Sequence, residues 1–347
     1  MAAHGSPRIL IVRLSAIGDV LHGLPVLVAL REALPDAYLA WVVEGRSSEL
    51  LRNHSSLDEV ISVPRGWLKK PSAVWNLRRR LRAEGFDIAI DVQGLTKSAV
   101  AAWLSGAPRR IGFAGQDGRE ISRWLNNELV LPARTHVVDR NLELLRAIAI
   151  DPRKVLFDLQ GDVSARDTAR SMLVDASLDG RFVLINPGAG WPSKLWPSER
   201  YAAVAHELGK RRAIGSLVVW AGEQEHRWAQ QIVAGSGGFA RLAPATSLSE
   251  LAALAELAAL FLGSDTGPMH LAAAVGTPCV ALFGPSSGER NGPYGPGHIV
   301  LQKMRLTGSS RERRTAGDEA MRAITVEDVL AACAHVLERS TALRQSA

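Results

Sequence analysis

Short apolar runs alternate with segments of helical periodicity along the whole chain, and this alternation restricts the possible folds more than any other feature. RILIVR (8–13), YLAWVV (38–43) and DIAIDV (87–92) are such runs in the first half. The pattern pauses in a connector, residues 151–180, and restarts with FVLI (182–185). Strands that alternate with helices form parallel, doubly wound sheets. The sequence therefore predicts an α/β protein made of two similar halves, with the active cleft between them at the strand carboxyl ends.

Length and composition agree with two domains that each bury a core. The chain has 347 residues, of which 47% are hydrophobic and 22% charged, an ordinary soluble composition. No apolar run reaches the roughly 18 residues that a membrane span needs, and MAAHGSPRILIVR lacks the apolar core of a signal peptide. Cys279 and Cys333 lie in a predicted strand and helix, so buried thiols are expected rather than a disulfide. These features predict a cytoplasmic protein.

The net charge of +6 is concentrated in the first half of the chain. Residues 1–160 contain 22 Lys and Arg against 17 Asp and Glu, whereas the remainder contains 19 against 18. One segment holds seven basic residues and no acidic one; they are Arg65, Lys69, Lys70, Arg78, Arg79, Arg80 and Arg82. Such a run is most often a solvated face, but it can also meet phosphates or an anionic membrane surface.

A turn between two predicted strands is the strongest local indication of a ligand site. The apolar run Leu260–Leu262 ends at Gly263-Ser264-Asp265-Thr266-Gly267, and a short helix and a second strand follow. Thr266 can cap that helix, whose positive end and free N–H groups suit a phosphate. Asp265 stands at the carboxyl end of a strand, where open α/β sheets bind ligands, and it could accept hydrogen bonds from sugar hydroxyls. A capped helix without a ligand would have the same sequence.

Other polar residues follow predicted strands. Asp19 could cap a helix or act as general base toward a hydroxyl acceptor, and Lys97 could hold an anionic acceptor or be a surface lysine. Lys194 precedes a helix. A cation near the positive end of a helix is unfavourable unless an anion lies between the two. Glu225 could accept hydrogen bonds from ribose hydroxyls or simply charge a helix N-terminus, whereas His270 fits packing or capping better than catalysis. Together they suit a nucleotide diphosphate-sugar in the second half and an acceptor in the first.

Several strong signatures are absent from the sequence. There is no GxxxxGK[ST] phosphate loop and no HExxH. Gly188-Ala189-Gly190 lacks the third glycine of a dinucleotide fingerprint, and no Cys/His cluster has metal spacing. A kinase, a dehydrogenase and a zinc hydrolase are thus poorly supported, and neither a metal nor a cofactor is expected.

Five motifs along the chain resemble those of glycosyltransferase family 9, the ADP-heptose:lipopolysaccharide heptosyltransferases. They are RLSAIGDVLHGLP, IDVQGLTKSA, NPGAGWPSKLWP, GSDTGPMHLAAAVGTPCVALFGP and GPYGP, in this order. SAIGDVLH and DVQGLTKSA are most similar to heptosyltransferase I, the branch that adds the first heptose to the Kdo of Kdo2-lipid A. The resemblance implies the GT-B fold, inversion at the anomeric carbon, and no metal-binding DxD motif; this sequence has no DxD triplet.

The resemblance also implies roles for individual residues. Asp19 matches the general base, and Lys97, Arg119, Arg65 and Lys69 lie on the acceptor side. The implied donor-binding residues are Lys194, Glu225, Asp265, Thr266, Gly267, His270, Ala189 and Gly190. Lys194 meets the diphosphate, Thr266 and Gly267 bind phosphate through backbone amides, and Glu225 binds ribose, although Glu223 is close enough to be confused with it. Where some relatives carry hydroxyl residues before the lysine, this chain has Ala189 and Gly190, which leaves backbone amides to hold phosphate.

The domains and partners follow from the same resemblance. Residues 1–160 are expected to form an acceptor-binding Rossmann-like domain and residues 161–322 a nucleotide-sugar-binding one. Residues 323–347 are expected to form a helix that packs back on the N-terminal domain. Separately from the resemblance, the polar and basic composition of Met304–Asp318 predicts a flexible loop. The implied partners are ADP-heptose, a lipid-linked Kdo acceptor and the anionic cytoplasmic face of the inner membrane, which a monomer contacts peripherally without binding nucleic acid.

Three alternatives remain open at this point. The chain could transfer the second heptose or another sugar, or it could be a nucleotide-sugar epimerase of GT-B type. More remotely, it could be a non-catalytic basic module that binds nucleic acid or a membrane. A nucleic-acid binder would lose affinity steeply with salt and would turn over no nucleotide sugar.

Overall fold

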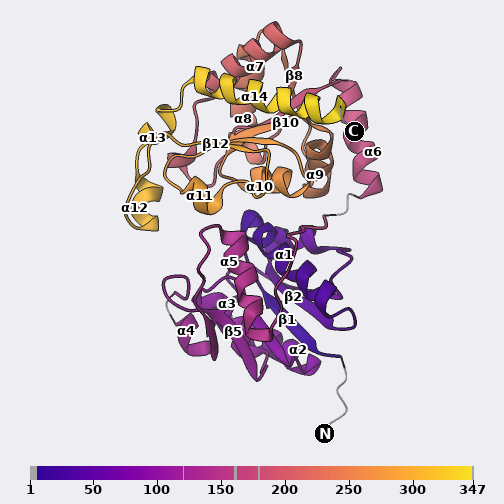
Figure 1. The fold of residues 1–347 in the computed structure, drawn as a ribbon, viewed down its shortest axis with the longest axis vertical. Coiled ribbons are helices and arrows are strands. Elements are labelled where there is room, and N and C mark those ends of the chain that lie inside the picture. Colours follow the sequence, from indigo (N-terminus) through magenta and orange to yellow (C-terminus); the bar gives the residue numbers. More distant parts are fainter. Residues whose placement is uncertain (1–5, 120, 160–161, 179, 346–347) are drawn as a thin grey trace. The chain divides into compact units, whose positions relative to one another are not determined.

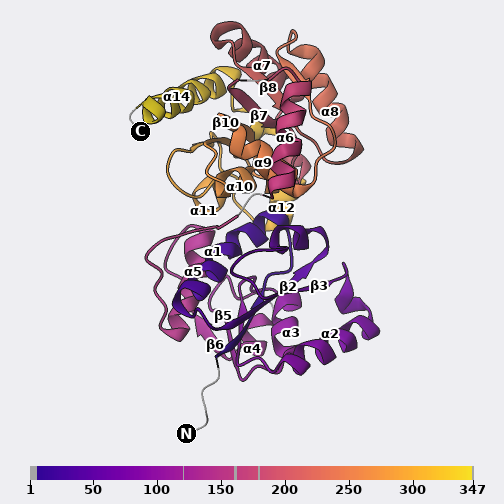
Figure 2. The same ribbon diagram turned by 90° about the vertical axis from the view of Figure 1, so that its right-hand side faces the viewer.

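The protein divides into two compact units, residues 1–160 and 161–347. Its computed structural model describes residues 6–119, 121–159, 162–178 and 180–345. Each unit has a six-stranded parallel sheet, and Figures 1 and 2 show helices on both faces of each sheet. The predicted α/β class is therefore confirmed.

The first unit has the strand order β3-β2-β1-β4-β5-β6. Its strands are β1 (Arg8–Val12), β2 (Tyr38–Glu44), β3 (Glu59–Val63), β4 (Ile88–Asp91), β5 (Arg109–Phe113) and β6 (Glu128–Val130). Its α-helices are α1 (Ile17–Ala33), α2 (Pro71–Glu84), α3 (Thr96–Leu104), α4 (Ser122–Leu125) and α5 (Val137–Glu143). Three 3-10 helices complete it: η1 (Gly45–Leu51), η2 (Trp67–Lys69) and η3 (Leu144–Ile148).

The second unit has the order β12-β11-β10-β7-β8-β9. Its strands are β7 (Phe182–Asn186), β8 (Gly215–Val218), β9 (Ala240–Leu242), β10 (Leu260–Ser264), β11 (Cys279–Leu282) and β12 (Ile299–Leu301). Its helices are α6 (Val163–Asp175), η4 (Pro192–Lys194), α7 (Ser198–Arg212), α8 (Gly222–Gly235), α9 (Leu248–Leu257), α10 (Gly267–Ala274), α11 (Gly288–Asn291), α12 (Ser310–Thr315), α13 (Glu319–Arg322) and α14 (Val326–Gln345).

The two sheets have the same connectivity when each is numbered from its own first strand. In both, the first and fourth strands lie side by side at the centre: β1 beside β4, and β7 beside β10. This is the Rossmann strand order, with a topological switch point between those two strands. The central strands are buried on both faces, which is why they read as continuous apolar runs; Ile9 to Val12 are fully buried.

The C-terminal helix differs from its prediction. α14 packs on the second unit, against α7, β11 and β12, instead of returning to the N-terminal domain. Its apolar face, which includes Val329, Cys333 and Val336, is buried in the same core cluster as Val183 and Leu260. The sequence shows such a face but does not say which sheet it covers.

The basic segment Met304–Asp318 is also not the continuous loop that its polar composition predicts. It contains α12, and the turn of α13 begins directly after it. The Ser309 hydroxyl accepts a hydrogen bond from the Glu312 amide at 3.3 Å, and the Glu312 carboxylate accepts one from the Ser309 amide at 2.6 Å. This reciprocal capping box starts α12 without any apolar periodicity.

Long apolar helices are not found in the described part of the chain: no helix there could cross a membrane.

Candidate active site

The predicted site residues lie at the two switch points. In the first unit, Asp19 follows β1 and Lys97 follows β4; in the second, Lys194 follows β7 and Asp265 follows β10. Because β1 neighbours β4 and β7 neighbours β10, the loops of each pair meet at one sheet edge. The topology therefore gathers residues that are about 70 to 80 positions apart in the sequence.

Asp19 is both a helix cap and one half of an ion pair. Its Oδ2 accepts a hydrogen bond from the Ala16 amide at 3.0 Å, which caps α1. Its Oδ1 lies 2.6 Å from Nη2 of Arg13, a buried side chain that also donates to the Val92 carbonyl. The Asp19 side chain nevertheless remains 46% exposed. A carboxylate fixed at two points and open on one side has the geometry that a general base needs.

Lys97 is held by a carboxylate that the sequence did not single out. Its Nζ lies 2.9 Å from Oε2 of Glu44, at the end of β2, and 2.7 Å from the Ser15 hydroxyl in the Asp19 loop. Burial raises the pKa of Glu44, but Lys97, the Gly66 amide and Ser15 together lower it below the usual range. Lys97 thus joins the loops of β1, β2 and β4, and its side chain remains partly exposed.

The loop after β4 is held in place by a buried carboxylate. Asp91 accepts hydrogen bonds from the Gln93 and Gly94 amides at 3.1 and 3.0 Å and from Asn126 at 3.1 Å, and its burial raises its pKa. Gln93 in turn bonds Leu14 and Ser15 in the Asp19 loop. The Arg119 amide donates to the Gly94 carbonyl at 2.9 Å, so the Arg119 backbone lies against this loop, and its side chain is exposed.

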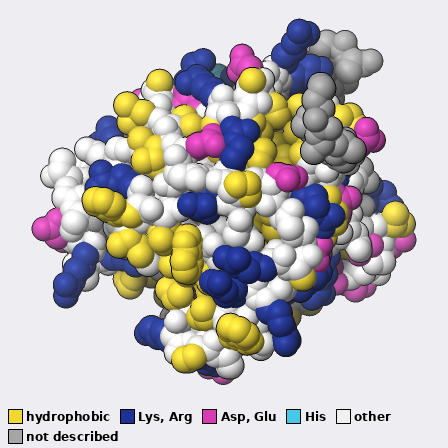
Figure 3. All heavy atoms as spheres, turned by 90° about the horizontal axis from the view of Figure 1, so that it is seen from below, with side chains coloured by type: hydrophobic (Ala, Val, Ile, Leu, Met, Phe, Trp, Pro, Cys, Tyr) yellow, Lys and Arg dark blue, Asp and Glu magenta, His cyan; other side chains and the backbone are white. Residues whose placement is uncertain are grey.

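Most residues of the basic run lie in η2 and α2, whereas Arg65 precedes η2 and Lys70 lies between the two helices. Arg80 pairs with Glu59 and Glu84, and the Arg78 guanidinium lies 5.9 Å from the centre of the Trp103 ring. Arg65, Lys69, Lys70, Arg79 and Arg82 are exposed. Two apolar side chains of the same segment are exposed with them, Trp75 (63%) and Leu68 (39%). Figure 3 shows hydrophobic and basic side chains side by side on the face that is lower in Figure 1.

A buried ion-pair cluster forms the centre of the second unit's site. Lys194 Nζ lies 2.5 Å from Oδ2 of Asp265, and His270 Nε2 lies 3.3 Å from Oδ1 of the same carboxylate. The side chains of Lys194 and Asp265 are only 11% and 9% exposed. Burial raises the pKa of Asp265, but the hydrogen bond with His270 and the charge of Lys194 lower it well below its usual range. Asp265 is thus a fixed anion that still has lone pairs for sugar hydroxyls.

The turn after β10 has the predicted cap. Thr266 is the N-cap of α10, and its Oγ1 accepts a hydrogen bond from the Met269 amide at 3.4 Å. Gly267 is the first residue of α10. The start of this helix therefore stands beside Asp265 with its positive end toward the strand carboxyl ends, an arrangement that attracts phosphate.

Glu225, rather than Glu223, meets the loop after β7. The Glu225 carboxylate occupies the space that a side chain at position 188 would need, so it is in contact with the Gly188 backbone. Glu225 also accepts a hydrogen bond from the Ala221 amide at 2.9 Å, and burial raises its pKa. Glu223 is exposed. Ala189 and Gly190 continue the same loop toward η4, so Glu225, this loop and Lys194 line one edge of the sheet.

Residues that the sequence reasoning missed include Arg13, Glu44 and Trp191. Arg13 directly follows β1 and Glu44 ends β2, and each forms an ion pair with a residue that follows a strand end, Asp19 and Lys97 respectively. A correct prediction of the strand order would have brought both residues to the site. The Trp191 ring has Lys194 Nζ 4.1 Å and Arg314 Cζ 4.8 Å from its centre. Among the described residues, no group of three or more His, Cys, Asp or Glu is arranged to hold a metal ion.

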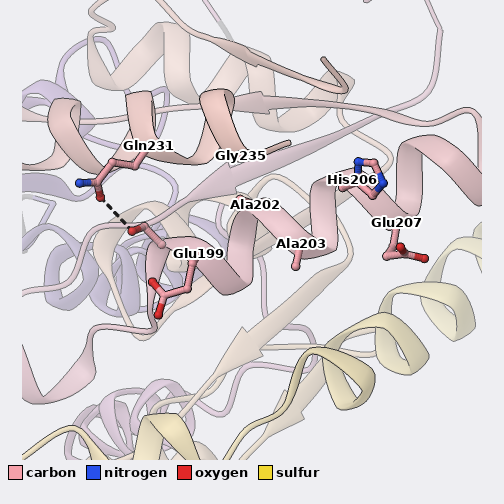
Figure 4. A pocket seen from close by; sticks show the side chains of 8 residues that line it. Glu199, Ala202, Ala203, His206, Glu207, Gln231 and Gly235 are labelled. Carbon is pink, nitrogen blue, oxygen red and sulfur yellow. Dashed lines mark hydrogen bonds between the residues drawn. The ribbon is translucent and has the colours of Figure 1, made fainter. Parts of the chain in front are cut away.

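A separate pocket lies between α7 and α8 (Figure 4). It is lined by Ser198, Glu199, Ala202, Ala203, His206, Glu207, Gln231 and Gly235. Ser198 bonds Gln231 across it at 2.9 Å, and Glu207 pairs with Arg211 on its own helix. None of these residues is one of the predicted site residues, and none bonds the Lys194–Asp265 pair.

Two Rossmann-like units of identical strand order, each with polar groups at its switch point, are the architecture of the GT-B fold, which many glycosyltransferases have. The model of "Glycosyltransferase family 9 (heptosyltransferase)" matches residues 74–319. Lipopolysaccharide heptosyltransferase 1 of Pseudomonas aeruginosa is 31% identical over 306 residues, which cover 85% of this chain and 83% of the relative. The chain belongs to glycosyltransferase family 9, and the prediction of a glycosyltransferase is confirmed.

Further relatives agree with this assignment. Lipopolysaccharide heptosyltransferase 1 of Escherichia coli K12 is 29% identical over 308 residues, 86% of this chain and 94% of the relative. A family 9 glycosyl transferase of Veillonella parvula has the same fold, with a TM-score of 0.81, 24% identity, and coverage of 96% of this chain and 97% of that one. The E. coli heptosyltransferase WaaC with ADP-2-deoxy-2-fluoro heptose gives a TM-score of 0.73 at 25% identity, over 93% and 97% of the chains.

Proposed function

We propose that this glycosyltransferase moves a heptose from ADP-heptose to the Kdo of the lipopolysaccharide inner core and inverts the anomeric carbon. The observation that carries the proposal is the Lys194–Asp265–His270 cluster beside the capped start of α10. It offers a cation and helix amides to a diphosphate and a carboxylate to a sugar. The names of the relatives support the chemistry, because lipopolysaccharide heptosyltransferase 1 is similar over most of both chains.

The donor is assigned to the second unit. Lys194 and the amides of Thr266 and Gly267 hold the diphosphate, Glu225 the ribose, and Asp265 and His270 the heptose. The related WaaC structure contains ADP-2-deoxy-2-fluoro heptose, which supports an ADP-sugar for this chain. Positive groups around the departing ADP stabilise the charge that develops on it, which is often the largest contribution to catalysis.

The acceptor is assigned to the first unit, with Asp19 as general base. The acceptor hydroxyl oxygen attacks the anomeric carbon while Asp19 takes its proton, and the bond from that carbon to the diphosphate oxygen breaks with its electron pair leaving on ADP. Lys97, Arg119, Arg65 and Lys69 surround the acceptor's carboxylates and phosphates. Because the attack and the departure occur on opposite sides of the carbon, the product has the inverted configuration.

The decisive assay measures ADP release from ADP-heptose with and without a Kdo-bearing acceptor. We expect release that depends on the acceptor, and a product with one heptose linked to Kdo. Release that requires a heptose already on the acceptor would identify a transferase of a later heptose. Turnover of a nucleotide sugar without any acceptor would contradict transfer and favour an epimerase.

Transfer is expected to survive removal of divalent metal. Lys194 and the start of α10 already supply positive charge for the diphosphate, and the sequence has no DxD triplet. Initial rates with excess EDTA should equal those without it. A complete loss that magnesium or manganese restores would mean that a cation holds the diphosphate in place of Lys194.

The exposed part of the basic run is expected to bind the acceptor's membrane. Arg79 is one helical turn from Trp75 on α2, so both lie on one side of the helix; an aromatic ring beside cations suits a membrane–water interface. Each basic residue near an anionic surface contributes roughly 1 kcal/mol. Replacing Lys69, Lys70 and Arg79 by Ser should weaken binding to anionic vesicles by on the order of 100-fold at low salt, and raise the acceptor KM.

The control for this experiment is Arg80→Ser, since Arg80 is occupied by Glu59 and Glu84. It should change vesicle binding much less, and neither variant should change the donor KM. The effect should shrink as salt rises, because exposed charges are screened beyond about 10 Å at 0.1 M. If vesicle binding and the acceptor KM stay unchanged at every salt concentration, the basic run is only a solvated face. Such membrane contact would place the protein peripherally on the cytoplasmic face of the inner membrane.

A further inference from the structure

Helix α12 is fixed to two loops that flank the Asp265 turn. The Ser193 hydroxyl donates to the Arg313 carbonyl at 2.8 Å, and Arg313 Nη1 donates to the Pro285 carbonyl at 3.3 Å. Ser193 follows β7 and Pro285 follows β11, and β10 lies between these strands in the sheet. The end of α12 is thus bonded on both sides of the strand that carries Asp265, so this basic segment belongs to the same sheet edge as the candidate donor site.

Arg314 brings a second cation to the ring that Lys194 contacts. Its Cζ lies 4.8 Å from the centre of the Trp191 ring, and Lys194 Nζ lies 4.1 Å from the same centre. Both distances are within the range of a cation–π interaction. A planar guanidinium stacks on an aromatic ring while its N–H groups remain free to bind in its own plane. Trp191 can therefore hold Arg314 in position without occupying its hydrogen-bond donors.

The charges at this edge are unbalanced. Lys194 is paired with Asp265, whereas no carboxylate within the described ranges lies at ion-pair distance from Arg314. The neighbouring Glu312 carboxylate accepts from the Ser309 amide at the start of α12. Arg314 is exposed, so it carries an uncompensated positive charge beside a site that already favours an anion. A diphosphate has two adjacent charged groups and can take one cation on each.

We propose that Arg314 is a second diphosphate-binding cation of the donor site, held in place by Trp191. The inference depends on the proposed donor site at Lys194 and extends it to α12. Arg314 would form a bidentate contact with the phosphate nearer the sugar, where negative charge grows as the glycosidic bond breaks. The basic segment that begins at Met304 then serves the donor and not the acceptor membrane.

The test compares ADP and AMP, because AMP lacks the second phosphate. Calorimetry on the full chain should show Arg314→Gln binding ADP about 10- to 100-fold more weakly than the unchanged protein, with AMP affinity little altered and kcat reduced. Arg314→Lys should recover part of the loss, since it restores the charge but not the planar fork. Arg311→Gln is the matched control: it removes the same charge from the same helix, and both affinities should stay unchanged.

Three outcomes would overturn the inference. If Arg314→Gln binds ADP as tightly as the unchanged protein, Arg314 does not contact the diphosphate, although the donor site at Lys194 stands. If Arg311→Gln weakens ADP binding to the same extent, the loss comes from the overall positive charge of α12 and not from a specific contact of Arg314. If the unchanged protein binds neither ADP nor ADP-heptose, the proposed function fails and this inference with it. Replacing Trp191 by Leu should reproduce the selective loss of ADP; equal losses of ADP and AMP would instead place the adenine on Trp191.

Discussion

Replacing Asp19 by Asn is expected to lower the rate of sugar transfer by about 100- to 10,000-fold and to leave donor affinity unchanged. The amide oxygen of Asn can still accept the Ala16 hydrogen bond that caps α1, so the fold should persist. The variant loses the ability to take a proton from the acceptor hydroxyl. Turnover with a Kdo-bearing acceptor and ADP binding by calorimetry, measured on the same preparation, separate the two effects.

The Arg13 ion pair requires a control, because Asn also removes that contact. Asp58→Asn provides one: Asp58 likewise pairs with a partly buried arginine, Arg31, at 2.6 Å and also accepts a backbone amide, from Leu39. It should have a comparable effect on stability and little on turnover. If Asp19→Asn retains near-normal turnover, Asp19 is a helix cap and ion-pair partner, and the base must be sought elsewhere.

The sequence predicted the sheet elements that have local signals. RILIVR, DIAIDV and the Leu260 run became β1, β4 and β10 because continuous apolar runs are buried between two helix layers. The Asp265-Thr266-Gly267 turn could be predicted because a few consecutive residues encode both the helix cap and the first helical turn. Short strands such as β6 and β9, with three residues each, have too few positions to show a pattern.

Contacts between distant segments were not predictable in the same way. The Lys97–Glu44 pair joins the end of β2 to the segment after β4. β2 and β4 are the two neighbours of β1 in the sheet, so the two residues flank the loop that follows β1. α14 shows the same limit, since the burial of Val329 and Cys333 is encoded but their partner sheet is not. For α12, a local signal was present: Ser309 and Glu312 form a capping box that the basic composition of the segment concealed.

The Lys97–Glu44 pair also changes the expected role of Lys97. A lysine that binds an acceptor alone would be free in the empty protein, whereas this one already bridges Ser15 and Glu44. An acceptor carboxylate would have to share the ammonium group with Glu44. Lys97 therefore positions the Asp19 loop. In the proposed function it would also link acceptor binding to the placement of the proposed base.

The largest loss of stability should come from breaking the buried Lys194–Asp265 pair. Lys194→Met leaves the Asp265 carboxylate, 9% exposed, with His270 as its remaining hydrogen-bond partner, and removing one partner of such a pair costs about 3–5 kcal/mol. Urea unfolding should show this loss. ADP binding should also fall, because the diphosphate loses its buried cation.

The double variant Lys194→Met/Asp265→Leu separates the structural role of this pair from its functional one. Removing both charges relieves the uncompensated carboxylate, so most of the lost stability should return, while ADP affinity should stay low. Equal unfolding free energies for the single and double variants would show that Asp265 gains no stability from Lys194, and that the pair is retained for the donor alone.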